Sequence, residues 1–317
     1  MSESNDYSDS NWQPDYNYQQ ARATYTADAK RSYAEAERKG TQDWDLLPES
    51  ITTPAEFAFL LAYDVTNSMS TWPVTIRSKA IFLDHEVRTM YLSEDTDMAF
   101  CAFGDAHKGE RYPLQVRPFV RGKREHELKL GELVHTELGG GNVHESSELA
   151  ALYFARNVHV PNQRRKPIVV IITDEMPFEQ ISVAMARDSA RVTLDKPIKT
   201  KAVFEELMRK CSVYVILKPY GEAFYQPEIT KTWEDLVGKD RIAMLPDEHR
   251  SVDVIFGILG HYSDKVAAFK AEIESRQTPD QVRVVYAALQ NIFANSVSDG
   301  RSIMHGMNDE GSDVGSL

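Results

Sequence analysis

Cysteine is scarce in this sequence, and no spacing of cysteines suits a metal cluster. The 317 residues include two cysteines, Cys101 and Cys211, and neither belongs to a CxxC pair. A disulfide framework and a structural zinc site are therefore not expected. Both cysteines lie in or beside apolar runs, so we predict that they are buried free thiols.

Basic residues are outnumbered, and long apolar runs are missing. Lys and Arg total 36 against 48 Asp and Glu, which gives a formal net charge of −12. A protein that wraps nucleic acid needs a concentrated basic surface, so no nucleic-acid partner is expected, and anionic membranes are also disfavoured. The apolar runs 57–63 and 168–172 are too short to cross a bilayer. Because residues 1–20 are polar and acidic, unlike a signal peptide, we expect a cytoplasmic protein with no membrane partner.

Composition divides the chain into four segments. Residues 1–48 are rich in Ser, Asp, Asn, Gln and Tyr, which predicts a disordered or loosely docked arm. Residues 49–262 carry the alternating apolar pattern of a folded domain. Helical patterns follow in 263–294, and the Ser-, Gly- and Asp-rich residues 295–317 predict a flexible tail.

The pattern of the main segment predicts a fold of the α/β class. Continuous apolar runs at 57–63, 98–103, 167–172 and 213–217 suit strands buried on both faces, with further strands at 114–120 and 242–245. Helical spacing separates them, most clearly over 145–157 and 204–210. Strands alternating with helices indicate a doubly wound, mostly parallel sheet with helices on both faces.

Oxygen-bearing side chains follow two of the buried strands. The first strand ends in Asp64, with Thr66 and Ser68 next at alternate positions, and the strand from residue 167 ends at Asp174. In open α/β sheets, ligands bind beyond the carboxyl ends of the strands. The chain must curl after the first strand for alternate side chains to meet one ion. Carboxylate and hydroxyl oxygens suit Mg²⁺ or Mn²⁺, with positions left for water.

A glycine-rich loop joins this set from the middle of the chain. Residues 139–141 are all glycine, which permits close approach of a loop, and Asn142 follows them. We take Asn142 as a further candidate ligand through its amide oxygen. Glu145, Ser146 and Ser147, just beyond it, are candidates for a substitute ligand.

These pieces, in this order, resemble a von Willebrand factor type A domain with its metal-ion-dependent adhesion site. The resemblance covers residues 50–262 and rests on Asp64-x-Thr66-x-Ser68, the glycine-rich loop and Asp174. It implies a Rossmann-like fold in which Thr66 and Ser68 ligate the ion directly, and Asp64 and Asp174 do so directly or through water. It implies Mg²⁺, with Mn²⁺ or Ca²⁺ as alternatives. Many members carry Thr, and others Asp, where this chain has Asn142.

The resemblance implies a binding module and no catalysis. In that family, a Glu or Asp of a partner protein completes the coordination of the ion. Intracellular type A domains often resemble components that work beside AAA+ ATPases, in chelatase-like, chaperone-like or stress and defence assemblies. An adaptor or scaffold whose partner is such an ATPase is therefore one expectation for this chain.

The main alternative is an enzyme. The segment Asp64-Val65-Thr66-Asn67-Ser68 also resembles the Asp-x-Thr-Gly-Thr loop of haloacid-dehalogenase-like phosphotransferases. Asp64 would then be the nucleophile and Mg²⁺ would neutralise the phosphate. That interpretation needs a later lysine, for which the sequence suggests no place, and an acidic pair that Asp174 and Glu175 imitate in part. Neither GxxxxGK[ST] nor GxGxxG occurs, which disfavours a nucleotide-binding protein.

Two other polar groups receive an ordinary interpretation. The basic cluster of Arg121, Lys123 and Arg124 is expected to be a solvated face. Asp105, which follows the second strand, is expected to be a loop residue, and the alternative is that it faces the same edge as the proposed site.

Overall fold

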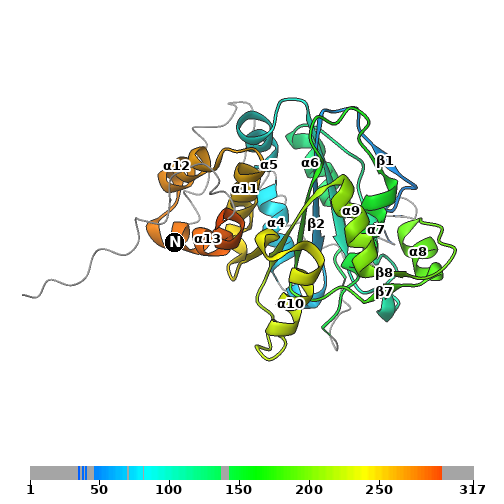
Figure 1. Cartoon of the computed structure of the whole chain (residues 1–317). Coiled ribbons are helices and arrows are strands. Elements are labelled where there is room, and N and C mark those ends of the chain that lie inside the picture. The colour runs from blue at the N-terminus through cyan, green and yellow to red at the C-terminus, as the bar shows by residue number, and fades with distance from the viewer. Residues whose placement is uncertain are drawn as a thin grey trace, which may run out of the picture.

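The computed structural model describes residues 46–69, 71–80, 82–136 and 143–294, together with Glu35, Arg38 and Gly40. This part of the chain is a mixed α/β structure around a six-stranded sheet (Figure 1). The sheet is built from β2 (Phe57–Asp64), β3 (Thr96–Phe103), β4 (Leu114–Val116), β6 (Ile168–Thr173), β9 (Ser212–Leu217) and β10 (Ile242–Met244).

The strand order across the sheet is β10-β9-β6-β2-β3-β4. All neighbours run parallel except β4, which pairs antiparallel with β3. The predicted α/β class and mostly parallel sheet are therefore confirmed. Of the strand predicted over 114–120, the regular part ends at Val116, because Pro118 has no N–H for the ladder. Pairing with β3 resumes at Val120, which forms an isolated antiparallel bridge with Met98.

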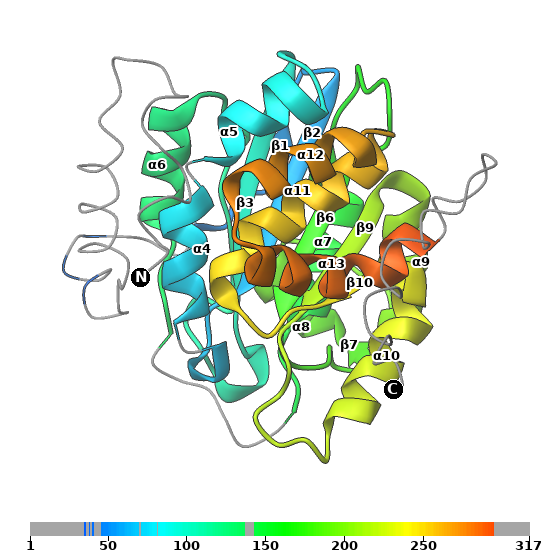
Figure 2. The ribbon, with the colours of Figure 1, turned by 90° about the vertical axis from the view of Figure 1, so that its left-hand side faces the viewer.

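Helices cover the two faces of the sheet. In Figure 1 most helices of the first group lie on one side of β2 and most helices of the second group on the other. Figure 2 looks onto the first group, with α11 and α13 crossing in front of the strands. The first group is α4 (Trp72–Ala80), α5 (Leu83–Glu86), α6 (Lys123–Glu132), α11 (Ser251–Tyr262), α12 (Val266–Arg276) and α13 (Pro279–Ala294). The second group is α7 (Ser147–Asn157), α8 (Val183–Ala190), α9 (Thr200–Lys210) and α10 (Gln226–Val237).

The central strand β2 contributes side chains to two hydrophobic cores, the first between the sheet and the first helix group and the second between the sheet and the second helix group. Phe59, Leu61 and Tyr63 pack with the first helix group, whereas Leu60 and Ala62 pack with the second. Successive side chains of a strand point to opposite faces, so an unbroken apolar run is what a strand covered on both faces requires. Cys101 and Cys211 are buried and free, as the sequence predicted.

The C-terminal helices share the first core with the sheet. Phe269 and Ile273 of α12 and Val285 and Leu289 of α13 are fully buried against it. Gly257 of α11 lies so close to this layer that a Cβ there would fall 2.1 Å from Leu289 Cδ1. None of the described helices is long and apolar enough to cross a membrane.

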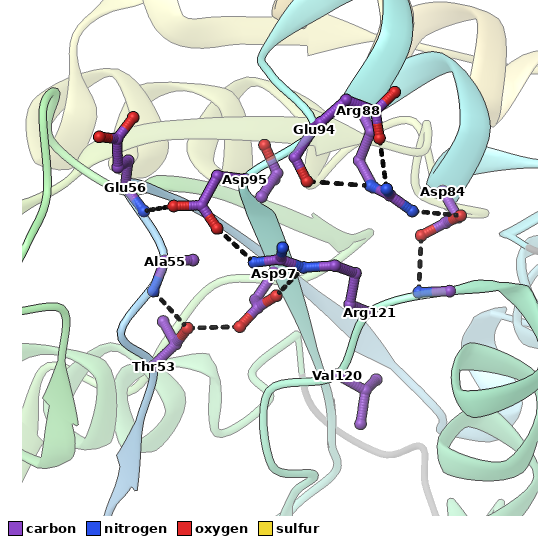
Figure 3. A network of polar contacts seen from close by, with 12 residues as sticks. Thr53, Ala55, Glu56, Asp84, Arg88, Glu94, Asp95, Asp97, Val120 and Arg121 are labelled. Carbon is purple, nitrogen blue, oxygen red and sulfur yellow. Dashed lines mark hydrogen bonds and ion pairs between the residues drawn. The ribbon is translucent and has the colours of Figure 1, made fainter.

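A polar network ties together the amino ends of the first strands (Figure 3). Arg121 donates to Asp95 and to Asp97, each over 2.6 Å, and Asp97 also accepts the Thr53 hydroxyl. The Arg121 side chain is 38% exposed, so it is partly solvated as expected, but it is also paired. The network lies at the amino edge of the sheet, and the residues predicted to bind metal follow the opposite edge.

Candidate metal site at the carboxyl edge of the sheet

The candidate site lies where β2 and β6 run side by side. Chain connections from β2 lead to β3 and β4 on one side, and those from β6 lead to β9 and β10 on the other. At such a point the connecting loops diverge and leave a crevice beyond the carboxyl ends of the strands, where α/β sheets bind ligands. Asp64 is the last residue of β2, and Asp174 directly follows β6.

Asp64 fixes the loop that follows β2 through hydrogen bonds to its carboxylate. Its side chain is fully buried, and Oδ1 accepts the Thr66 backbone N–H over 2.8 Å and the Thr66 hydroxyl over 2.7 Å. Its other oxygen accepts the Thr173 hydroxyl over 3.2 Å. Asp64 therefore fixes the position of the Thr66 oxygen.

A single turn of 3₁₀ helix, η3 (Asn67–Met69), brings Ser68 back over Thr66. The two hydroxyl oxygens are 3.0 Å apart, and the Ser68 hydroxyl donates to Asp174 Oδ1 over 2.9 Å. The side-chain oxygens of Asp64, Thr66, Ser68 and Asp174 thus form one continuous chain across the two strand ends.

Lys218 completes this chain of contacts from a third strand. It directly follows β9, and its Nζ lies 2.7 Å from Asp174 Oδ2. The same ammonium donates to the main-chain oxygen of Ser68. Lys218 is absent from the residues predicted for this site, although the rule that located Asp64 and Asp174 also points to it, because it follows an apolar strand.

Two buried glutamates lie beside the chain of oxygens. The Glu145 N–H donates to the Met176 carbonyl over 2.9 Å, so the segment leading into α7 runs along the segment that follows β6. In the part of the chain that the structure describes, both carboxylate oxygens of Glu175 and Oε2 of Glu145 are buried without a hydrogen-bond partner. A buried polar atom without a partner is costly, so a ligand that reached these carboxylates would gain from pairing with them.

Burial and mutual repulsion disturb the ionisation of these groups. Burial, reinforced by the charges of Asp64 and Asp174, raises the pKa of Glu175 to about 9. Burial and the charge of Asp174 also raise the pKa of Asp64. Burial and the charges of Asp64 and Glu175 raise the pKa of Glu145. This edge of the sheet therefore holds more acidic groups than the surrounding protein can neutralise when all of them are ionised.

The donor set fits a hard divalent cation. Mg²⁺ binds its oxygen ligands at about 2.1 Å in an octahedron, so two adjacent ligand oxygens are about 3 Å apart. Two oxygens joined by a hydrogen bond are separated by a similar distance. The Thr66–Ser68 and Ser68–Asp174 oxygen separations, 3.0 and 2.9 Å, match this value. Among the described residues no three His, Cys, Asp or Glu side chains are grouped to hold a metal. An ion at this edge would therefore depend on the two hydroxyls.

The structure thus brings together Asp64, Thr66, Ser68 and Asp174, four of the five residues predicted from the sequence. The fifth, Asn142, lies with the triglycine outside the described residues. Asp105 lies in the loop after β3, where it accepts the His107 N–H over 2.8 Å. It is also buried, and its charge adds to the effect of burial in raising the pKa of Glu145 and of Glu175, so it faces the same edge. His144 stacks on Phe178, with ring centroids 5.2 Å apart.

Comparisons with known proteins identify no family. No family model matches the chain, and no curated protein matches it. Among solved structures, the pilus adhesin SpaC from Lactobacillus rhamnosus GG in its open conformation aligns with a TM-score of 0.48 at 10% identity. That alignment covers 70% of this chain and 31% of the adhesin. Another structure of the same adhesin aligns with a TM-score of 0.46 at 11% identity, over 70% of this chain and 31% of that one. Likenesses this distant support no statement about this chain.

Proposed function

We propose that this chain is a metal-dependent protein-binding module with a doubly wound fold of the von Willebrand type A kind. Mg²⁺ at the carboxyl edge of the sheet would be its anchor for an acidic side chain of a partner. The observation that carries the proposal is the unbroken chain of oxygens from Asp64 through Thr66 and Ser68 to Asp174, at the point where β2 and β6 diverge.

The topology supports this proposal. Counted in chain order, the six strands lie in the order 3-2-1-4-5-6, which is the order of the doubly wound nucleotide-binding folds. The proposed site lies between strands 1 and 4 of that order. Helices pack on both faces, as the doubly wound arrangement requires.

Each residue has a distinct part in the proposal. Thr66 and Ser68 would offer neutral hydroxyl oxygens to the ion, while Asp174 would offer charge. Asp64, which is fully buried, would orient Thr66 and would balance part of the charge of the ion. Because hydroxyl ligands donate little charge, the bound ion would stay electrophilic and accept a carboxylate from outside. Asn142, with Glu145 as a substitute, is proposed as the contribution of the glycine-rich loop.

The partner and place of action are part of the same proposal. The expected partner is a protein that offers Glu or Asp, and an AAA+ ATPase is one candidate. We propose a cytoplasmic adaptor or scaffold.

Calorimetry of the full chain with Mg²⁺ and Mn²⁺ tests the metal site first. The wild type should bind one ion, and Asp174→Ala should not. The wild-type protein should then capture different proteins from a lysate of its native cells in buffer with Mg²⁺ and in buffer with a chelator. In buffer with Mg²⁺, Asp174→Ala should capture only those proteins that the wild type captures in the presence of chelator. Ion binding by Asp174→Ala as tight as by the wild type would contradict the site, and identical captures would contradict the function.

The phosphotransferase alternative gains one observation. Lys218 supplies the lysine that this interpretation lacked, 2.7 Å from Asp174. Against it, the proposed nucleophile Asp64 has no exposed surface, and both of its oxygens accept hydrogen bonds. Hydrolysis of an aryl phosphate by the wild type that Asp64→Asn abolishes would establish the enzyme, whereas equal background rates in both would exclude it.

A further inference from the structure

We propose that the Lys218 ammonium is a built-in cation that competes with the divalent ion for Asp174 and Ser68. Loading the site with metal then requires this ammonium to leave. The inference rests on the proposed function and names what regulates the same site.

The position of Lys218 is set by the sheet. Its backbone N–H donates to the Thr173 carbonyl over 3.0 Å, which continues the β6–β9 pairing beyond the last strand residues. Lys218 and Asp174 therefore begin from neighbouring, fixed backbone positions. Their ion pair differs from most surface pairs, which lose side-chain freedom to form and contribute little. The Asp174 side chain is 1% exposed and that of Lys218 is 19% exposed.

The ammonium contacts the same residues that the ion needs. It holds Oδ2 of Asp174 and the main-chain oxygen of Ser68, while the Ser68 hydroxyl holds Oδ1 of Asp174. Lys218 therefore places its positive charge on the carboxylate that would supply charge to the metal. Two cations that share one buried carboxylate repel each other strongly where water screens poorly.

One ammonium does not satisfy the whole edge. Asp64, Glu145 and Glu175 also lie there, and the Glu175 oxygens and Glu145 Oε2 have no partner in the described structure. A divalent ion therefore gains attraction that Lys218 does not exhaust. The partly exposed lysine has a route into solvent along its flexible stem. Two states follow: a metal-free state closed by Lys218, and a loaded state with Lys218 released.

Calorimetry with Mg²⁺ and Mn²⁺ on the full chain tests this competition. Lys218→Met removes the charge and keeps much of the apolar stem, whereas Lys218→Arg keeps the charge. We expect Lys218→Met to bind at least tenfold more tightly than the wild type, and Lys218→Arg to bind within about threefold of it. Lys231→Met, at an exposed lysine of α10 paired with Asp235, is the matched control and should change nothing.

The outcomes separate this inference from the proposed function. Wild type and Lys218→Met binding equally would overturn the competition and leave the metal site intact. Weaker binding by Lys218→Met would also overturn it and make Lys218 a positioning residue for Asp174. No binding by the wild type or by Lys218→Met would overturn the proposed function, and the inference with it.

Lysine labelling gives a second measurement on the wild type, which decides the matter if Lys218→Met does not fold. An amine-acylating reagent, read by mass spectrometry, should modify Lys218 slowly without metal and faster with saturating Mg²⁺. The exposed Lys231 is the internal reference and should not respond. A Lys218 labelling rate that Mg²⁺ leaves unchanged or lowers would overturn the proposed release.

Discussion

Trp233 donates its indole N–H to the main-chain oxygen of Glu175 over 2.9 Å, inside the second core. Trp233 belongs to α10, and Glu175 follows Asp174, so the bond connects a covering helix to the loop that carries a predicted metal ligand. The indole ring also meets Phe204 of α9 edge-on, with centroids 5.6 Å apart. The loop after β6 is thus held from the helical layer as well as from the sheet.

Replacing this tryptophan tests the connection. Trp233→Phe removes the donor and leaves the Glu175 carbonyl buried without a partner, which costs about 1–3 kcal/mol of unfolding free energy before any loss of packing. Urea denaturation measures the change. Phe224→Leu, at a highly exposed aromatic residue, should stay within about 0.5 kcal/mol of the wild type. Equal stability of Trp233→Phe and wild type would show that the bond does not hold the loop.

The buried Asp64 should be needed for metal more than for folding. Asp64→Asn keeps the side-chain shape and an acceptor for Thr66, but removes a charge that burial disfavours. We expect a folded variant whose Mg²⁺ affinity falls about 10- to 100-fold. Calorimetry and thermal unfolding measure the two effects. A variant that fails to fold would mean that the Asp64 charge is part of the protein's structural support.

Stability should fall with rising pH through Glu148. Burial raises the pKa of Glu148 from its ordinary value of 4.5 to about 8. A raised carboxyl pKa in the folded state means that the folded protein keeps a proton that the unfolded chain loses. The stabilising contribution is complete below about pH 4.5 and is lost as pH rises through about 8.

Glu148→Gln isolates this contribution. The glutamine keeps an acceptor for the Phe178 N–H, which Glu148 binds over 3.1 Å, and cannot ionise. Denaturation at several pH values should show a smaller decline between pH 5 and 8 in the variant, with a gain on the order of a few kcal/mol at pH 8. Parallel pH profiles for the two proteins would contradict the assignment.

Arg121 should matter little, despite its close contacts. Its pairs with Asp95 and Asp97 are partly exposed, so Arg121→Ala should cost about 1 kcal/mol or less in urea denaturation. Because the network lies at the amino edge of the sheet, Mg²⁺ affinity should not change. A change in metal affinity would indicate coupling between the two edges.

The last helix should be part of the main core. Leu289 of α13 is fully buried, and Leu289→Ala should cost about 2–5 kcal/mol. Gln290→Ala, at the next and exposed position, is the matched control and should stay within about 0.5 kcal/mol. A small effect of Leu289→Ala would show that α13 contributes little to the stability of the sheet.

The sequence by itself determined the α/β class and the edge of the sheet where the candidate site lies. Unbroken apolar runs such as 57–63 identify buried parallel strands, because only strands covered on both faces use every position for the core. The residues that follow such strands meet at one edge, so the strand pattern places Asp64 and Asp174 at the same edge. That the two lie side by side there was decided by the strand order, in which β2 and β6 are neighbours. The pairing of Thr66 and Ser68 followed from their spacing of two, which the curl of η3 realises.

Only the tertiary structure decided which groups surround that edge. Lys218 reaches Asp174 because β9 pairs in register with β6, and register between strands far apart in sequence is not written in either local pattern. The burial of Glu145 and Glu175 depends on which helices cover the loops. Arg121 finds Asp95 and Asp97 only after its own loop returns to the start of β3. Local periodicity specifies strands and helices, whereas charge pairing and burial depend on contacts between distant segments that form together on folding.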